Sequence, residues 1–172
     1  MTALPGVFQP HLSSGLSMEL SDILSEVSVL VLSKAADKSE LFRTLSERAA
    51  ISTGLDAATI YEALAAREAL GSTGLGNGLA IPHGKLAGLK GVTALFVRLV
   101  EPMDFESIDD EKVDLVMTLL APAGAGADHL KALARVARLL RTEALVRNLR
   151  STTEPPRLYE MLTAPVASQN AA

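Results

Sequence analysis

Residues 71–86 read GSTGLGNGLAIPHGKL and are the most informative stretch of the chain. Five of the 12 glycines fall within it, between a helical pattern and an apolar strand pattern, which is not where a flexible linker is expected. Glycines let backbone N–H groups approach a bound anion closely, and the hydroxyl and amide side chains between them add donors. The stretch predicts a loop that holds a phosphoryl group. Its candidate contacts are Ser72, Thr73, Gly76, Asn77 and Gly78.

His83 stands between Pro82 and Gly84 at the end of this stretch. Proline fixes its own φ and biases Ile81 toward extended geometry, so we expect His83 to emerge rigidly from a short strand, Leu79–Ile81. An imidazole held in this way can attack phosphorus as a nucleophile without a metal or a nucleotide. The alternative is a histidine that only hydrogen-bonds at a strand end. The residues alone leave both interpretations open.

Two nucleotide-binding motifs do not fit the stretch. A P-loop would need glycine and Ser/Thr at the positions that Leu79 and Leu86 occupy. A dinucleotide fingerprint would need a small residue where Leu79 or Ile81 stands, with a helix rather than a strand after it. Nucleotide binding is therefore disfavoured, and no cofactor is predicted.

Strand and helix patterns alternate outward from this stretch. Short apolar runs predict buried strands at Glu26–Ser33, Val92–Val100 and Val113–Ala121. Apolar periodicity and capping residues predict helices from Asp37 to Ala50, from Asp56 to Gly71, and at Asp128–Leu140, Thr142–Arg150 and Pro155–Leu162. This order of elements predicts an α/β fold in which a mixed central β-sheet is sandwiched between helices.

The length of 172 residues suits one domain, which we expect at residues 18–163 between flexible tails at 1–17 and 164–172. Neither a secretory signal nor a membrane-spanning run is found, which predicts a cytoplasmic protein without membrane insertion. A net charge of -4 and 3% aromatic residues disfavour nucleic acid as a partner. The absence of cysteine excludes a disulfide and a thiolate nucleophile.

The run from Arg67-Glu68 through GSTGLGNGLAIPHGKL resembles the signature of enzyme IIA proteins of the mannitol/fructose class in the bacterial phosphoenolpyruvate-dependent phosphotransferase system. The resemblance is greatest to the nitrogen-regulatory branch of that class and covers about residues 18–163. It continues at Pro102, Phe105, Ile108-Asp109, Val113-Asp114-Leu115 and His129-Leu130. Leu75 and Leu79 stand where isoleucine is more usual, a change that leaves the chemistry undisturbed.

The resemblance implies a phosphotransferase component that acts as an acceptor and carrier, with a transient phosphohistidine at His83. It implies a phosphorylated histidine-carrier protein as the donor, and target proteins such as transporters or kinases that respond to the phosphorylation state. Two residues are candidate helpers. Arg67 would contact the phosphate bidentately through its guanidinium. His129, expected in the first turn of a helix, would donate a hydrogen bond to a phosphoryl oxygen. The alternatives are an ordinary ion pair for Arg67, with Glu68 or another carboxylate, and a buried histidine satisfied by a backbone carbonyl for His129.

Two other functions remain open from the sequence. The chain could be a sugar-specific enzyme IIA that relays phosphate to an enzyme IIB of a mannitol/fructose-type permease. The other is metal-dependent hydrolysis, with His83 and His129 as metal ligands. The sequence offers no obvious third ligand, so no metal is predicted. The basic stretch 131–150 is interpreted as a solvated face, with partner docking as the lesser alternative, and Asp109–Glu111 as a solvated acidic turn. His11 lies in the N-terminal tail and carries no prediction.

Overall fold

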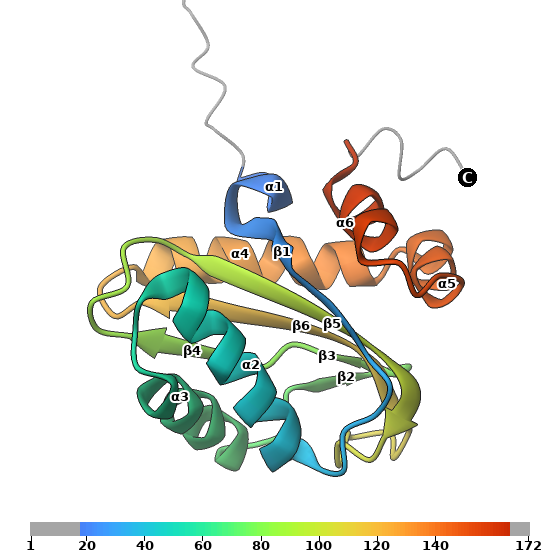
Figure 1. Ribbon diagram of the computed structural model, residues 1–172, viewed down its shortest axis with the longest axis horizontal. Coiled ribbons are helices and arrows are strands. Elements are labelled where there is room, and N and C mark those ends of the chain that lie inside the picture. The colour runs from blue at the N-terminus through green and yellow to red at the C-terminus, as the bar shows by residue number, and fades with distance from the viewer. Residues whose placement is uncertain (1–17, 166–172) are drawn as a thin grey trace, which may run out of the picture.

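A computed structural model describes residues 18–165, which form six helices and six strands (Figure 1). The helices are α1 (Leu20–Ile23), α2 (Lys38–Thr53), α3 (Ala57–Ala69), α4 (Gly126–Leu140), α5 (Glu143–Arg150) and α6 (Pro155–Thr163). The strands are β1 (Leu24–Leu32), β2 (Gly74–Gly76), β3 (Leu79–Ala80), β4 (His83–Leu86), β5 (Thr93–Met103) and β6 (Val113–Pro122). The tail 1–17 with His11, and all but the first two residues of the tail 164–172, lie outside the described residues.

All six strands belong to one mixed sheet. Its order is β1-β5-β6-β3-β2, and β4 also pairs with β6. The β1/β5, β3/β6 and β4/β6 pairs are parallel, whereas β5/β6 and β2/β3 are antiparallel. Since both β3 and β4 lie along the same side of β6, residues 81 and 82 form a short break between two strands that continue in one direction.

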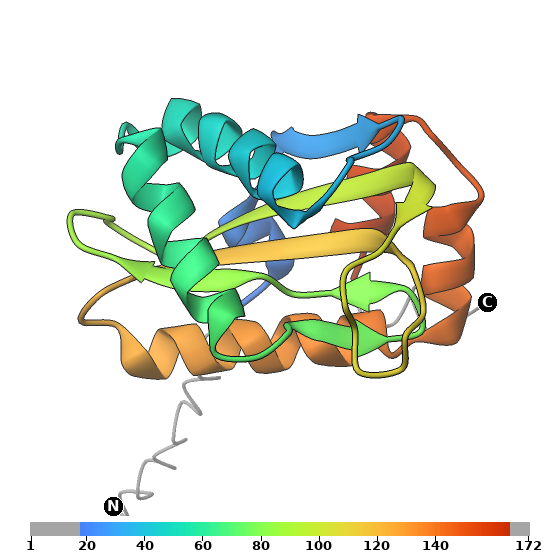
Figure 2. The same cartoon turned by 90° about the horizontal axis from the view of Figure 1, so that it is seen from below.

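Helices cover both faces of the sheet, as the sequence predicts, and each face has its own apolar core. Neighbouring residues of β5 and β6 alternate between the two cores: Phe96 and Met117 pack toward α4, α5 and α6, whereas Val97 and Val116 pack toward α2 and α3. Figure 2 shows α2 and α3 on one side of the strands and α4 along the other. A strand buried on both faces is apolar at nearly every position, which explains the almost continuous apolar runs in the sequence.

Most of the predicted elements are present, with shifted bounds. Asp37 and Asp56 accept hydrogen bonds from backbone N–H groups of the first turns of α2 and α3, so both capping predictions are confirmed. The first of these helices continues past the predicted end at Ala50 to Thr53. Three short elements were not predicted: α1, β2 and β4. No helix within residues 18–165 is both long and apolar enough to cross a bilayer.

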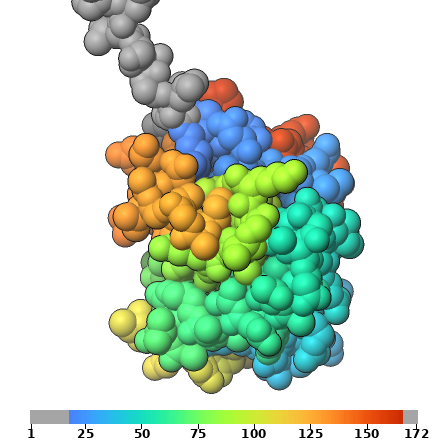
Figure 3. All heavy atoms as spheres, turned by 90° about the vertical axis from the view of Figure 1, so that its left-hand side faces the viewer, coloured from blue at the N-terminus to red at the C-terminus, as the bar shows by residue number. Residues whose placement is uncertain are grey.

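Gly84 allows helix α3 to approach the sheet. A Cβ atom added at Gly84 would lie 3.3 Å from the Cβ of Ala63 and 3.4 Å from its carbonyl carbon. Any larger residue would force α3 away from β4. Figure 3 shows the end of the molecule where α3, the residues that follow β4 and the start of α4 meet at the surface.

Candidate functional site

His83 is the first residue of β4 and pairs with Leu119 of β6. Pro82 ends the break between β3 and β4, and its carbonyl accepts a hydrogen bond from the Leu119 N–H at 3.0 Å. The sequence predicts that His83 follows Pro82 at a strand, and the structure places it at the start of β4. The strand assignment was wrong in one respect, because His83 opens a second strand rather than following Leu79–Ile81.

The hydrogen bonds of His83 define its tautomer. Its Nδ1 lies 2.8 Å from the carbonyl oxygen of Ile81, which can only accept, so Nδ1 carries the proton. The Nε of Arg67 donates to Nε2 of His83 at 3.2 Å, and an arginine Nε is always a donor. The Nε2 atom therefore presents a lone pair, which is the state that a nucleophilic imidazole requires.

The surroundings of His83 favour its neutral form. Burial lowers the pKa of this half-buried side chain, and the positive charge of Arg67 lowers it further. The hydrogen bond to Ile81 and the negative charge of Glu68 act in the opposite direction, but the pKa stays below its ordinary value. At neutral pH the imidazole is therefore uncharged and able to attack.

Arg67 lies in the last turn of α3, and its guanidinium joins the histidine to the loop. In addition to the bond to His83, its Nη1 donates to the carbonyl oxygen of Gly71 at 3.0 Å. The alternative of an ordinary ion pair is wrong, because among residues 18–165 neither Glu68, which pairs with Lys38 at 2.9 Å, nor another carboxylate forms an ion pair with Arg67.

His129 lies in the first turn of α4, and its ring neighbours that of His83. The two ring centroids are 5.4 Å apart, and the side chain of His129 is buried. Its Nδ1 atom is buried and has no hydrogen-bond partner among residues 18–165, so no backbone carbonyl of this part of the chain satisfies that nitrogen. Burial lowers the pKa of His129, and the charges of His83 and Lys85 lower it further, so this ring is also neutral at neutral pH.

A hollow of about 270 Å³ opens in front of the histidine. Arg67 and His83 line it, together with residues of the loop, Ile81 and two residues of α4. These other lining residues are Ser72, Thr73, Gly74 and Leu75 of the loop, Ile81, and Leu133 and Ala137 of α4. The hollow is large enough for a phosphoryl group together with the tip of a donor side chain. Within it a histidine lone pair and a guanidinium lie side by side.

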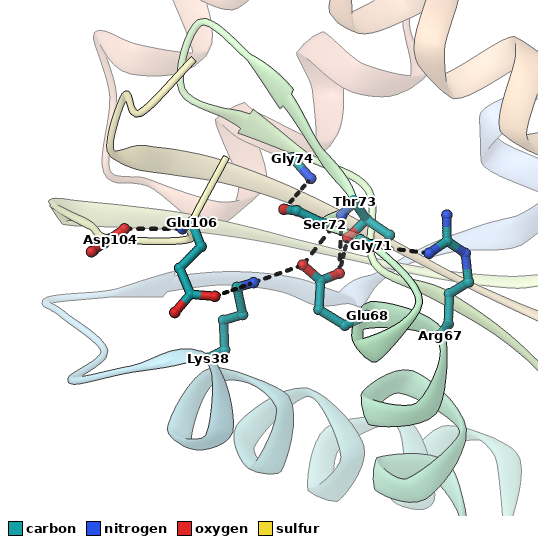
Figure 4. A network of polar contacts seen from close by, with 9 residues as sticks. All are labelled: Lys38, Arg67, Glu68, Gly71, Ser72, Thr73, Gly74, Asp104 and Glu106. Carbon is teal, nitrogen blue, oxygen red and sulfur yellow. Dashed lines mark hydrogen bonds and ion pairs between the residues drawn. The ribbon is translucent and has the colours of Figure 1, made fainter. Parts of the chain in front are cut away.

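Ser72 and Thr73 differ in what they can offer to an anion in the hollow. The backbone N–H and the hydroxyl of Thr73 both donate to the carboxylate of Glu68 (Figure 4). The hydroxyl oxygen of Ser72 accepts from the N–H of Gly74 at 3.2 Å, which leaves its hydrogen to donate elsewhere. Ser72 is therefore the better candidate contact of the two.

The structure does not bring Gly76, Asn77 and Gly78 to His83. Gly76 ends β2, and Asn77 and Gly78 form the turn that leads to β3; the φ values of the three residues are 88°, 55° and 79°. The N–H of Asn77 donates to Asp109, and its carbonyl accepts from Arg150. An Asn-Gly pair between two strands is a hairpin signal that the sequence contained. These three residues therefore belong to the β2–β3 hairpin. Of the five predicted phosphate contacts, Ser72 and Thr73 remain near His83.

Most charged residues of the two stretches are exposed, as the sequence predicted. Arg150 contacts Asp114 through Nε and Nη2, and Arg135 pairs with Glu19 at 3.3 Å, so two of the six cations in 131–150 have structural partners. The acidic turn Asp109–Glu111 is exposed, as predicted, and Asp109 also accepts a hydrogen bond from the N–H of Asn77 in the β2–β3 turn. As for metals, residues 18–165 contain no group of three His, Asp or Glu side chains placed to hold an ion.

We expect stability to fall between about pH 7 and pH 5, because both histidines have pKa values below their unfolded value of about 6.5. The unfolded chain binds protons in this range that the folded chain does not, so the free energy of unfolding decreases as the pH falls. Urea unfolding at several pH values measures the effect. A His83→Gln/His129→Gln variant should lose much of this slope, and an unchanged slope would contradict the assignment.

The sheet, the two neighbouring histidines and the hollow describe an α/β protein with a half-buried, neutral histidine beside a surface hollow. Residues 22–164 match the family model of the phosphoenolpyruvate-dependent sugar phosphotransferase system, EIIA 2, and the chain belongs to this family. It is a phosphoryl carrier of that system and exchanges phosphate with partner proteins of the system.

Several relatives are similar over almost their full length. A nitrogen regulatory protein of Bradyrhizobium diazoefficiens is 45% identical over 88% of this chain and 99% of that protein. One from Escherichia coli is 37% identical over 86% of this chain and 91% of the relative. The crystal structure of nitrogen regulatory protein IIA-Ntr from Neisseria meningitidis matches with a TM-score of 0.78 and 34% identity, covering 84% of this chain and 99% of that one.

Proposed function

We propose that Nε2 of His83 accepts a phosphoryl group from a phosphorylated histidine-carrier protein. The observation that carries this proposal is the orientation of the ring, in which the Ile81 carbonyl fixes the proton on Nδ1 and Nε2 faces Arg67. The phosphorylated and free forms of the chain then bind target proteins, such as transporters or kinases, to different extents. Similarity to nitrogen regulatory proteins over most of the chain supports a role in nitrogen regulation.

The transfer needs no other reacting group. The lone pair of His83 Nε2 forms the new bond to phosphorus as the bond between phosphorus and the carrier's imidazole nitrogen breaks, and that nitrogen takes the electron pair. Arg67 turns from Nε2 to the phosphoryl oxygens, where its charge stabilises the transferring group. The Nδ1–H stays bonded to Ile81, so the ring carries a positive charge while Nε2 is bonded to phosphorus, and the negative phosphoryl oxygens lie beside that charge.

A second candidate is the relay of phosphate to an enzyme IIB for sugar uptake. It has some support, because a 2-O-alpha-mannosyl-D-glycerate-specific EIIABC component of Escherichia coli is 31% identical over 84% of this chain, although the match covers 22% of that protein. The nitrogen-regulatory relatives are more similar and match in length.

Labelling by a phosphorylated carrier tests the proposed function. The expected product is an acid-labile, alkali-stable adduct that peptide mapping places on His83. Labelled protein is then mixed with an enzyme IIB of the mannitol/fructose type. Retention of the label supports a regulatory role, and rapid onward transfer supports sugar transport. A label on any other residue overturns the assignment of His83.

We expect His129→Ala to be phosphorylated on His83 about tenfold more slowly, or to hold the group for a shorter time. The neutral ring of His129 lies 5.4 Å from that of His83 and can donate one hydrogen bond to a phosphoryl oxygen, an interaction of about 0.5–1.5 kcal/mol. Single-turnover transfer and the lifetime of the adduct measure the effect. Unchanged values for both, or a label on His129 in the parent protein, would exclude the helper role.

A further inference from the structure

We propose that Glu68, held by Lys38, is a positioning residue that keeps His83 in its reactive tautomer through Thr73 and Ile81. The proposal deepens the proposed function, on which it rests. Neither Glu68 nor Lys38 reaches the reacting nitrogen. Their effect passes through backbone atoms of the loop, and each link is a hydrogen bond in the structure.

Glu68 occupies a position that a carboxylate does not ordinarily favour. It lies in the last turn of α3, where the negative end of the helix dipole disfavours an acidic group, and its side chain is only 7% exposed. Burial alone would raise the pKa of Glu68, but hydrogen bonds from Thr73 and Lys38 hold the pKa below its ordinary value. The carboxylate is therefore charged, buried and fully engaged.

Lys38 is the counter-charge that makes this arrangement possible. Its Nζ lies 2.9 Å from Glu68 and 4.7 Å from the centre of the Phe105 ring, and its side chain is 20% exposed. A second carboxylate, Glu106, lies 3.6 Å away but is exposed and so contributes little. Lys38 begins helix α2, so the ion pair joins the start of α2 to the end of α3 (Figure 4).

The link to the histidine runs through Thr73. Glu68 accepts from both the N–H and the hydroxyl of Thr73, which fixes the backbone of that residue. The carbonyl of Thr73 accepts from the N–H of Ile81 at 3.0 Å. The carbonyl of Ile81 in turn accepts from Nδ1 of His83 at 2.8 Å. A shift of Thr73 would thus displace the carbonyl that keeps the proton on Nδ1.

Arg67 gives the same network a second route to the site. It directly precedes Glu68, and its Nη1 donates to the carbonyl of Gly71, two residues before Thr73. One end of α3 therefore places both the guanidinium beside Nε2 and the carboxylate that orients the loop. Positioning of this kind affects the rate of the chemical step more than the docking of the donor.

Two variants test the proposal: Glu68→Gln, which keeps the shape but loses the charge, and Thr73→Val, which loses only the hydroxyl. We expect each to lower the maximal single-turnover rate by about tenfold, with the half-saturating carrier concentration unchanged. We also expect ¹⁵N NMR of the unphosphorylated variants to show a mixture of His83 tautomers, in place of the single Nδ1–H form of the parent.

Controls separate positioning from a general loss of structure. Glu62→Gln removes the same charge from an exposed position on α3 and should behave as the parent does. Thr73→Ser should recover most of the rate that Thr73→Val loses. If Glu68→Gln does not fold, as circular dichroism would show, the two Thr73 variants still carry the test.

The tautomer measurement distinguishes failure of this inference from failure of the proposed function, because it needs no phosphorylated partner. If the parent protein is not labelled on His83, the proposed function is wrong, whatever the tautomer of His83. Parental maximal rates together with a single Nδ1–H tautomer in both variants would overturn the role of Glu68. A rise in the half-saturating carrier concentration alone would also overturn it, since that result assigns Glu68 to docking.

Discussion

His83→Ala should take up no phosphoryl group from a phosphorylated carrier, whereas the parent becomes labelled in a single turnover. Alanine removes the only atom proposed to form the bond to phosphorus, so the expected loss is complete rather than partial. The fold should be retained, because His83 is half-buried at the start of β4 and the backbone hydrogen bonds of this strand do not use the imidazole.

Intact-protein mass spectrometry under alkaline conditions is the measurement, with circular dichroism to confirm folding. His129→Ala is the matched control, since it also removes an imidazole from the same pair of rings and should still be labelled on His83. If His83→Ala were labelled as fully as the parent, a different residue would be the acceptor and the interpretation of the hollow would have to change.

The main features of the fold could be predicted from the sequence because they depend on burial. Residues such as Phe96 and Val97 lie in opposite cores, so from Ala94 to Val100 their strand is apolar at every position except Arg98 and stands out in the sequence. The capped helices are equally visible, since Asp37 and Asp56 act through backbone groups a few residues away.

The short strands were harder to foresee. β2 and β4 contain three and four residues, fewer than periodicity can reveal, and their glycines are more typical of loops. The Asn77-Gly78 turn was hidden for a different reason. Its glycines lie beside those of the histidine loop and were interpreted as one anion-binding unit, whereas the hairpin places them beside Arg150.

The two neighbouring histidines of the candidate site were singled out from the sequence, but the network of contacts around them was not. His83 is identifiable from its neighbours Pro82 and Gly84, and His129 from its place on the inward stripe of its helix. Lys38 lies 30 residues from Glu68, and nothing in the local pattern joins the two. Contacts between the ends of two helices depend on how those helices pack, and a single sequence does not contain that information.

Arg67→Lys should slow phosphoryl transfer to His83 on the order of a hundredfold, the effect typical of removing one donor that stabilises a transition state. The guanidinium makes two contacts at once, to Nε2 of His83 and to the carbonyl of Gly71. Lysine keeps the charge but has a single nitrogen, so it cannot hold both contacts or bind a phosphoryl group bidentately. Rapid-quench single turnovers measure the rate, and Arg48→Lys on the exposed side of α2 is the control.

Arg67→Gln separates the geometry of this residue from its charge. The positive charge of Arg67 lowers the pKa of His83, so its removal should raise that pKa and leave more of the imidazole protonated at a given pH. The acid limb of the pH–rate profile should therefore move to higher pH in Arg67→Gln and stay near its parental position in Arg67→Lys. Equal rates for Arg67→Lys and the parent would remove Arg67 from the site. If Arg67→Lys is slow but its acid limb does not move, the planar guanidinium, and not the positive charge alone, is required for fast phosphoryl transfer to Nε2 of His83.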